Sequence, residues 1–422
     1  MQSMVIRYVV ATIGLLICGW AIWTSWNAGA SRLLAGQSRK ETPSLALADR
    51  AISLSPFDPE AYYARGRAYL TLKRYPEASK DFAAAVNLRP GHYLSWLQLG
   101  YARSRAGDQQ GALTAYQEGV RLAPSYGQPR WFLGNALLRA GRRDEGFSEL
   151  RRAAINDPGT FVQTIAVAWN EYDGDASAVE RALQPQSSSA RLQLARFLVE
   201  HENATAALEL FRGTDTVSAA DQKALLEALI KARKLNEAYE VWSSGRGASH
   251  QGSRSGIASI TDSGFESDIN LDESGFGWRP ARDLKTVRVF LDTNLPRSGG
   301  SSLRLSWTGD SSPSTPVVSQ IVLVEPNTRY RVSFSARTEE LLTIGLPIVT
   351  VSDSSSVKET VLGESSAFPR GTSGWQDYSI DFTTGEITSA VLIAIRRQPC
   401  DTAPCAALGN VWVDEFSLRR VQ

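Results

Sequence analysis

Residues 56–90 read PFDPEAYYARGRAYLTLKRYPEASKDFAAAVNLRP, and the spacing within this stretch recurs along the chain. Prolines mark the interval, which is 34 residues long. Small residues and bulky residues keep the same interval at fixed places inside it. The columns are Pro56, Pro90, Pro124 and Pro158; Gly66, Gly100 and Gly134; Ala78, Ala112 and Gly146; and Phe82, Tyr116 and Leu150. A repeat of this length predicts stacked helical hairpins.

Each column has a physical role in such a hairpin. Glycine lies where the two helices approach too closely for a side chain, and alanine does the same on the second helix. The bulky residues fill the space between hairpins, and each proline ends one helix before the next begins. With Tyr62, Tyr69 and Ala85 added, these residues resemble the tetratricopeptide signature. The resemblance covers residues 41–245, is weaker at 159–187, and implies an α-solenoid without naming a partner.

The resemblance also implies a binding groove, because the first helix of each hairpin lines the concave face of such arrays, where extended peptides bind. The matching positions are Tyr63, Leu97 and Trp131; Arg67, Tyr101 and Asn135; and Arg105 and Arg139. Aromatic rings beside arginines suit a peptide backbone or an acidic segment. The alternative is that Tyr63, Leu97 and Trp131 only pack between helices. The cluster of Lys and Asn with which some family members hold a terminal carboxylate is absent, so that activity is not expected.

Residues 1–30 are predicted to be a transmembrane anchor or a signal peptide. Residues 8–26 read YVVATIGLLICGWAIWTSW and hold no charge. A helix rising about 1.5 Å per residue crosses a bilayer core of about 30 Å with this length. Ala28-Gly29-Ala30 has the form of a cleavage site, but the apolar stretch exceeds the usual core of a signal peptide. We therefore favour a retained anchor.

Two cysteines near the C-terminus bear on the compartment. Cys400 and Cys405 bracket a short loop with no His nearby, and two cysteines alone cannot make a tetrahedral metal site. A disulfide is the functional interpretation and requires an oxidising compartment, whereas two unpaired thiols are the alternative. We expect a single-pass protein of a bacterial inner membrane with most of the chain in the periplasm, although basic residues after the apolar segment oppose this orientation.

A Gly/Ser-rich linker at residues 246–257 separates the repeats from a different pattern. Beyond it apolar residues alternate with polar ones, as at Leu303, Leu305 and Trp307. About eight or nine such segments with turns between them predict an antiparallel β-sandwich over residues 258–422.

Three landmarks of this region resemble the jelly-roll carbohydrate-binding modules of the galactose-binding-like fold. They are SGFE at residues 263–266, SGGSSLRL at 298–305 and VDEFSL at 413–418. The resemblance implies a structural calcium between Glu266 and Asp414, with backbone carbonyls completing the six to eight oxygens that calcium takes. Surface or turn acids are the alternative, and no cofactor is required.

Glycan binding needs exposed aromatic faces. Trp278 falls in a predicted loop, and Trp412 is out of phase with Val411 and Val413, which makes these two tryptophans the exposed candidates.

Catalysis is not expected from this sequence. The three His residues lie far apart, and no nucleophile elbow, phosphate-binding loop or HExxH motif occurs. With 45 basic and 44 acidic residues the net charge is +1, so no overall field attracts nucleic acid.

The composition and the motifs together predict a membrane-anchored, non-enzymatic scaffold. Its groove binds a protein partner, and its sandwich binds glycan or another envelope component, in a setting such as surface polysaccharide assembly or export. One alternative is a protein–protein adhesion factor whose sandwich binds no sugar. Another is an accessory subunit of a glycan-processing enzyme.

Overall fold

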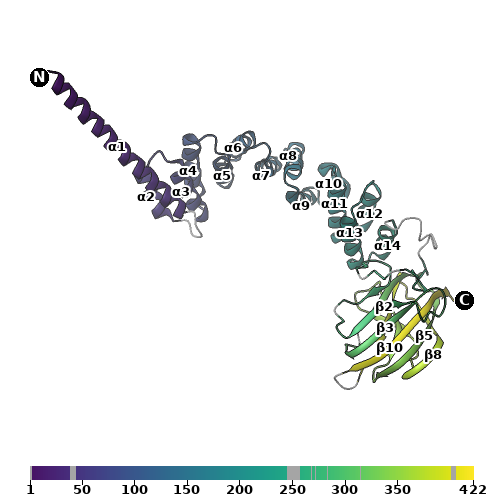
Figure 1. Ribbon diagram of the computed structural model, residues 1–422. Coiled ribbons are helices and arrows are strands. Elements are labelled where there is room, and N and C mark those ends of the chain that lie inside the picture. The colour runs from purple at the N-terminus through teal and green to yellow at the C-terminus, as the bar shows by residue number, and fades with distance from the viewer. Residues whose placement is uncertain are drawn as a thin grey trace. The chain divides into compact units, whose positions relative to one another are not determined.

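The computed structural model describes residues 2–38, 44–244, 257–267, 269–270, 272–282, 284–313, 315–400 and 405–422 (Figure 1). The chain divides into two compact units, Met1–Gln184 and Pro185–Gln422. The described residues of unit 1 form helices and their connections. Unit 2 begins with further helices and continues into two β-sheets.

The described residues of unit 1 form the helices that the 34-residue interval predicts, together with others before and after them. They are α1 (Gln2–Ser38), α2 (Leu45–Leu54), α3 (Pro59–Thr71), α4 (Tyr75–Leu88), α5 (Tyr93–Arg105), α6 (Gln109–Leu122), α7 (Gly127–Arg139), α8 (Arg143–Asn156), a 3-10 turn (Pro158–Thr160), α9 (Phe161–Glu171) and α10 (Ala176–Leu183). Helices α3 and α4, α5 and α6, and α7 and α8 pack as hairpins. The helical repeat prediction is confirmed.

The glycine column lies where the two helices of a hairpin are closest. A Cβ atom at Gly100 would lie 2.6 Å from Cε1 of Tyr116, which is inside van der Waals contact. The other two pairs of the column are Gly66 with Phe82 and Gly134 with Leu150. The bulky column therefore fills the interior of its own hairpin, where the sequence predicted only a place between hairpins.

Helix α1 continues from its apolar part into the repeats. Ser31 and Ala35 are fully buried near its end, and Ser31 Oγ donates a hydrogen bond to Asp58 Oδ2 at 2.9 Å. Ala35 packs with the alanines of α2 and α3. The end of α1 thus serves as the first helix of a hairpin with α2, and the repeat packing begins before residue 41. By length and composition alone, residues 10–37 are the one described helix able to cross a membrane.

Unit 2 starts with two more hairpins, formed by α11 with α12 and by α13 with α14. Their bounds are α11 (Ser188–Glu200), α12 (Ala204–Arg212), α13 (Ala219–Lys231) and α14 (Leu235–Ser244). The linker predicted at residues 246–257 lies outside the described residues except for Ile257.

Two five-stranded sheets follow the helices, and every pairing within them is antiparallel. The strands are β1 (Arg279–Pro280), β2 (Val287–Asp292), β3 (Ser302–Asp310), β4 (Val318–Leu323), β5 (Arg329–Thr343), β6 (Pro347–Asp353), β7 (Thr360–Glu364), β8 (Gly371–Thr383), β9 (Ala390–Arg397) and β10 (Ala406–Arg420). One sheet has the order β1-β4-β9-β6-β7 and the other β2-β3-β10-β5-β8. Alternate residues of both sheets meet in one apolar core, which confirms the predicted antiparallel sheet domain.

The last hairpin packs directly on the segment that leads into β1. The ring centroids of Trp242 in α14 and Phe276 are 5.6 Å apart, and Trp242 Nε1 donates to Glu273 Oε1 at 2.8 Å. Tyr239 meets Phe276 edge-on at 5.1 Å. A Cβ atom at Gly275 would lie 2.0 Å from Trp242 Cδ1, so the approach requires glycine. The sequence, which placed a linker between two separate parts, did not predict this contact.

Candidate protein-binding site

A hollow of about 460 Å³ lies between α5, α6 and α7 of unit 1, and we call it the repeat hollow. Its walls combine aromatic rings, amides, a hydroxyl and two guanidinium groups. The lining residues are Tyr101, Ser104, Arg105, Gln109, Tyr116, Trp131, Phe132, Asn135 and Arg139.

Five of the predicted groove residues line this hollow. They are Tyr101, Arg105, Trp131, Asn135 and Arg139, all on the first helices of two successive hairpins. Asn135 is held in place because its Nδ2 donates to the Trp131 carbonyl at 2.8 Å.

The other three predicted groove residues lie elsewhere. Leu97 is 2% exposed and belongs to the core of its hairpin, and Tyr63 meets Phe82 edge-on at 5.5 Å. Leu97 and Tyr63 therefore pack between helices, as the alternative interpretation stated. Arg67 is exposed on α3 and is not part of the hollow.

Sequence reasoning missed part of the lining, most of all Tyr116 and Phe132. Their rings stack with centroids 5.6 Å apart and an angle of 12° between planes. Tyr116 belongs to the bulky column of the 34-residue interval, so a signal was present, but it indicated packing. Because Tyr116 fills the space over Gly100 and also reaches the hollow, one residue serves both purposes.

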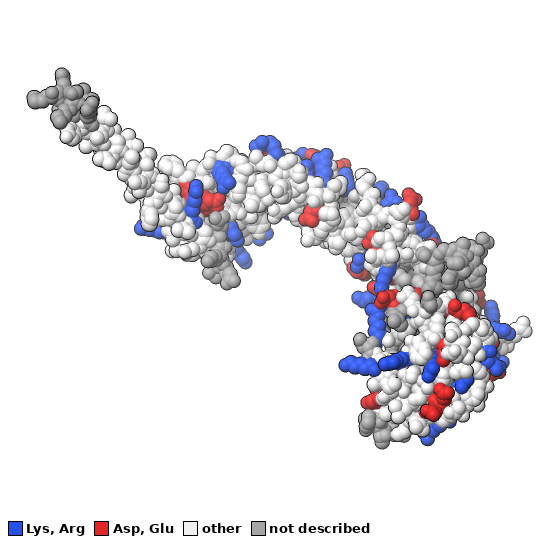
Figure 2. All heavy atoms as spheres, in the orientation of Figure 1, with Lys and Arg blue, Asp and Glu red and all other residues white. Residues whose placement is uncertain are grey.

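The hollow is cationic. Arg105 and Arg139 line it, and none of its lining residues is acidic. Arg105 Nη2 donates to the Tyr75 hydroxyl at 3.3 Å, and its guanidinium lies 5.2 Å from the centre of that ring. Burial raises the pKa of Tyr116 to about 12, so its phenol stays protonated at neutral pH and can donate. On the face of the molecule shown in Figure 2, both signs of charge are interspersed.

The structure brings Glu266 and Asp414 to the same loop, residues 297–300. Asp414 is fully buried, and its Oδ2 accepts from the backbone N–H groups of Arg297 at 2.9 Å and Ser298 at 3.2 Å. Both carboxylate oxygens of Glu266 accept from Gly300 N–H. Burial raises the pKa of Asp414.

Two carboxylates fall short of a calcium cage by themselves. Within the described ranges no three His, Cys, Asp or Glu side chains gather as a metal site. Glu266 and Asp414 brace the loop through its N–H groups, and calcium would need most of its oxygens from backbone carbonyls. The calcium ion stays a prediction.

The two tryptophans predicted to be exposed are buried. Trp278 is 5% exposed because its segment folds back on the core, where its ring lies 4.9 Å from that of Phe416. Trp412 does point away from the core, but it is 0% exposed because Arg304 and Arg337 cover its ring at 4.7 and 4.8 Å. The prediction that these indoles offer a free face to a sugar is wrong.

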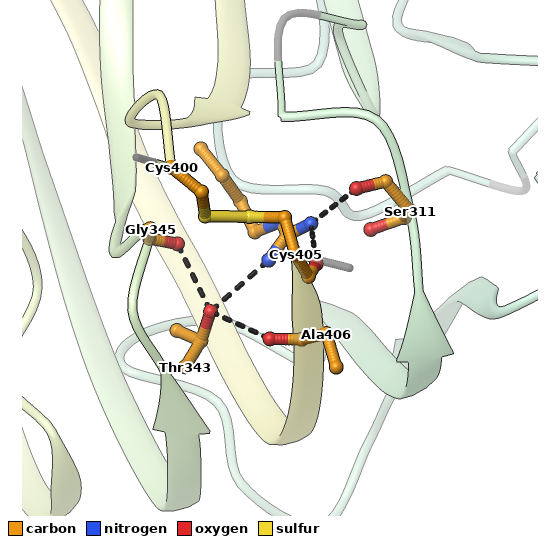
Figure 3. Close-up of a disulfide and its surroundings, with 7 residues drawn as sticks. Ser311, Thr343, Gly345, Cys400, Cys405 and Ala406 are labelled. Atoms are coloured by element: carbon orange, nitrogen blue, oxygen red, sulfur yellow. Dashed lines mark hydrogen bonds between the residues drawn. A yellow bond between two sulfur atoms is a disulfide. The ribbon is translucent and has the colours of Figure 1, made fainter. Parts of the chain in front are cut away.

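Cys400 and Cys405 form the predicted disulfide (Figure 3). The adjoining Arg397 is 2% exposed, and burial lowers its pKa. Its Nη1 donates to Thr343 Oγ1 at 3.0 Å and its Nη2 donates to the Cys405 carbonyl at 2.6 Å and to the Ser311 carbonyl. The disulfide therefore fixes a residue whose carbonyl accepts from a buried cation.

The hairpins and the hollow define a helical repeat protein of the kind that mediates protein–protein contacts. Residues 59–92 and 97–160 match two family models, both described as tetratricopeptide repeat, so these residues are tetratricopeptide repeats.

Curated relatives match part of the chain. Anaphase-promoting complex subunit 3 of Schizosaccharomyces pombe is 23% identical over 181 residues, which is 40% of this chain and 27% of that protein. The Hsp70-Hsp90 organizing protein of Triticum aestivum is 35% identical over 94 residues, 22% of this chain and 15% of that protein. The chain thus spans about a quarter or less of the length of these relatives.

Among solved structures, a crystal structure of MamA overlaps 49% of this chain and 94% of its own, with 15% identity and a TM-score of 0.32. MamA residues 41-end from Desulfovibrio magneticus RS-1 overlap 45% and 98%, with 20% identity and a TM-score of 0.31. TM-scores of this size describe partial overlaps only.

Proposed function

We propose that this protein is a membrane-tethered, non-enzymatic scaffold that recruits a protein partner by binding an acidic, partly apolar segment in the repeat hollow. The observation that carries the proposal is the lining of the hollow, which has two arginines, four aromatic rings and no acid. Tetratricopeptide repeats bind protein partners. The residues that line the hollow indicate which side chains such a partner would present.

The physical fit has two parts. Guanidinium groups offer planar forks of donors that match carboxylates, so Arg105 and Arg139 suit Asp or Glu side chains. Trp131, Phe132 and Tyr101 supply apolar area at small entropic cost, as at the centres of protein interfaces. A segment that alternates acidic and apolar side chains satisfies both.

The apolar part of α1 is proposed to be the anchor. It leads without a break into the first hairpin, so the repeats would lie next to the membrane surface rather than on a free tether. A single-pass protein of a bacterial inner membrane with its repeats in the periplasm stays our proposal for location, since the disulfide requires an oxidising compartment. A reporter fused after Gln422 that is active only in the cytoplasm would exclude this orientation.

An array of random peptides tests the repeat hollow directly. The full chain in detergent should select peptides with Asp or Glu beside aromatic or aliphatic residues. Reversing both charges, with Arg105→Glu and Arg139→Glu, should weaken those peptides by at least about 100-fold, because each charge-assisted contact is worth about 1.5–3 kcal/mol.

Arg67→Glu is the control, because it reverses one charge in the same way on an exposed first-helix position outside the hollow. It should change the affinity by less than about 3-fold, as expected for a distant surface charge. Equal loss in the control and in the double variant would show a general charge effect, and retention in both would exclude the hollow as the binding surface.

Binding of glycan by the sandwich is a second proposal, and it rests on the resemblance to jelly-roll carbohydrate-binding modules. With Trp278 and Trp412 buried, the better-placed aromatic is Phe290, which is 39% exposed and lies 5.3 Å from the Arg304 guanidinium. A glycan array probed with the full chain and with Phe290→Ala should show retention that the variant loses. If no glycan is retained at high protein concentration, the result favours the alternative that the protein is an adhesion factor whose sandwich binds no sugar.

A further inference from the structure

The loop between α2 and α3 lies beside the apolar part of α1. We call this loop, residues 55–58, the anchor loop. Its last residue, Asp58, accepts a hydrogen bond from Ser31 Oγ in α1 at 2.9 Å. Along the helix, Ser31 is about 7.5 Å beyond Trp26, where the apolar part ends. The hydrogen bond therefore holds the anchor loop close to the end of the apolar part.

The packing of α2 and α3 shows that the anchor loop is the end of these helices nearest to the apolar part. Ala61 and Ala64 of α3 belong to the same buried cluster as Ala35, which is about one turn further along α1 than Ser31. Helix α3 therefore runs away from the apolar part, and α2, which precedes the loop, runs back toward it. A membrane around α1 would meet the anchor loop before the rest of these two helices.

The anchor loop carries an exposed aromatic residue, Phe57, which is 83% exposed. Single apolar residues are common on protein surfaces. The 34-residue interval shows, however, that this phenylalanine is specific to this loop, because the equivalent positions of the later loops are Gly91, Ser125 and Gly159. An aromatic residue thus occurs at this position of the interval beside the apolar part of α1 and not further along the repeats.

The charged groups next to Phe57 are satisfied within the protein. Asp58 is 5% exposed, and its carboxylate accepts from Glu60 N–H at 3.1 Å as well as from the α1 hydroxyl. The Glu60 carboxylate accepts in turn from Arg89 Nη1 at 3.1 Å. The exposed side chains of the anchor loop are those of Pro56 and Phe57. The loop therefore presents apolar groups and not a charge.

We propose that Phe57 inserts into the interface of the lipid bilayer that holds α1, which gives the repeats a second contact with the membrane. The inference rests on the proposed anchor. Phenylalanine is typical of the apolar surfaces that peripheral proteins bury at the boundary between headgroups and acyl chains. The headgroup layer adds about 5–7 Å to each side of the apolar core, which matches the height of the anchor loop above Trp26. Two contacts prevent unit 1 from turning about the axis of α1, which a single helix allows.

Fluorescence quenching in vesicles tests this contact. The full chain is reconstituted in phosphatidylcholine vesicles, with a spin-labelled phosphatidylcholine as the quencher and an environment-sensitive dye on one cysteine. A dye on Phe57→Cys should be quenched and its emission shifted to the blue, in a Cys18→Ser chain where the other two cysteines form the disulfide. The matched control is Leu72→Cys in the same background, because Leu72 is 55% exposed at the opposite end of α3. Its dye should be neither quenched nor shifted.

A dye on Cys18 of the native chain reports on the anchor itself, because this thiol lies in the apolar part of α1. Quenching at Cys18 together with equal signals from positions 57 and 72 would overturn the inference and leave the proposed anchor intact. Absence of quenching at Cys18 would remove the anchor, and the inference with it.

A second variant shows whether the phenylalanine ring makes the contact. With the dye on Pro56→Cys, the further change Phe57→Asp should reduce the quenching to the level of position 72, because a charged side chain is costly to remove from water. Both residues are exposed, so the thermal unfolding should stay unchanged. Undiminished quenching after Phe57→Asp would overturn the proposed role of the ring.

Discussion

At Gly100 the two helices of a hairpin leave no room for a methyl group, which would meet the Tyr116 ring at 2.6 Å. We therefore predict that Gly100→Ala lowers the free energy of unfolding by about 1–3 kcal/mol, because the Tyr116 ring must shift. Denaturant unfolding followed by circular dichroism measures it. Gly91→Ala is the control, since nothing lies within 4 Å of that position. If Gly100→Ala instead raised the free energy of unfolding by about 1 kcal/mol, as helix propensity alone would do, the steric argument would be contradicted.

Asp381 shows how neighbouring arginines set the pKa of a carboxyl group. Arg331 donates to it at 2.6 and 2.8 Å and, with Arg329, lowers the pKa of Asp381 to about 2. Because the folded pKa lies below the unfolded one, the pair stabilises the fold above the unfolded pKa, and this contribution is lost as the pH falls toward 2. We predict that Arg331→Gln raises the pKa of Asp381 toward its ordinary value in an NMR titration. An unchanged pKa would assign the shift to Arg329.

Single residues also show which features could be predicted from the sequence and which could not. The glycine column could be predicted, because a fixed interval exposes a close approach that each hairpin repeats. The phase of Trp412 in its strand could also be predicted, but not its burial. Arg304 in β3 and Arg337 in β5 cover the ring of Trp412. Because both arginines are far from Trp412 in the sequence, no local sequence pattern indicates that they cover it.

At the scale of elements, the disulfide between Cys400 and Cys405 holds the Cys405 carbonyl where it accepts a hydrogen bond from the buried Arg397. We predict that Cys400→Ser with Cys405→Ser lowers the free energy of unfolding by about 2 kcal/mol, the loop-closure contribution for a ring of this size. Thermal unfolding measures it, and a reductant should reproduce the loss in the native chain only. Equal sensitivity of both chains to the reductant would contradict the assignment.

For the groove, too, the sequence predicted the residues that one repeat specifies, but not those that depend on how successive hairpins pack. First-helix positions could be assigned from the repeat, and five of them meet in one hollow. Tyr116 and Gln109 come from α6, and their part in the lining depends on how far each hairpin turns against the next. No residue pattern within a hairpin encodes that turn.

In unit 2, the last hairpin and the sandwich meet at Trp242, which is 9% exposed. We predict that Trp242→Ala lowers the free energy of unfolding by about 3–5 kcal/mol, as for other buried aromatic truncations, and does so in the transition that reports the sandwich. Calorimetry of the full chain measures this. Phe57→Ala, at an aromatic that is 83% exposed, should have no such effect. An unaffected sandwich transition would show that the two parts unfold independently.

The proposed scaffold function requires that a partner occupies the repeat hollow when the protein is anchored in its membrane. A photo-reactive phenylalanine analogue at Gln109, inside the hollow, should cross-link a partner on illumination of intact membranes. Mass spectrometry should place the adduct on a segment carrying Asp or Glu. The same group at Ile155, which is 70% exposed in unit 1 and does not line the hollow, should give no such adduct. No adduct at Gln109, or equal adducts at both positions, would contradict the central claim.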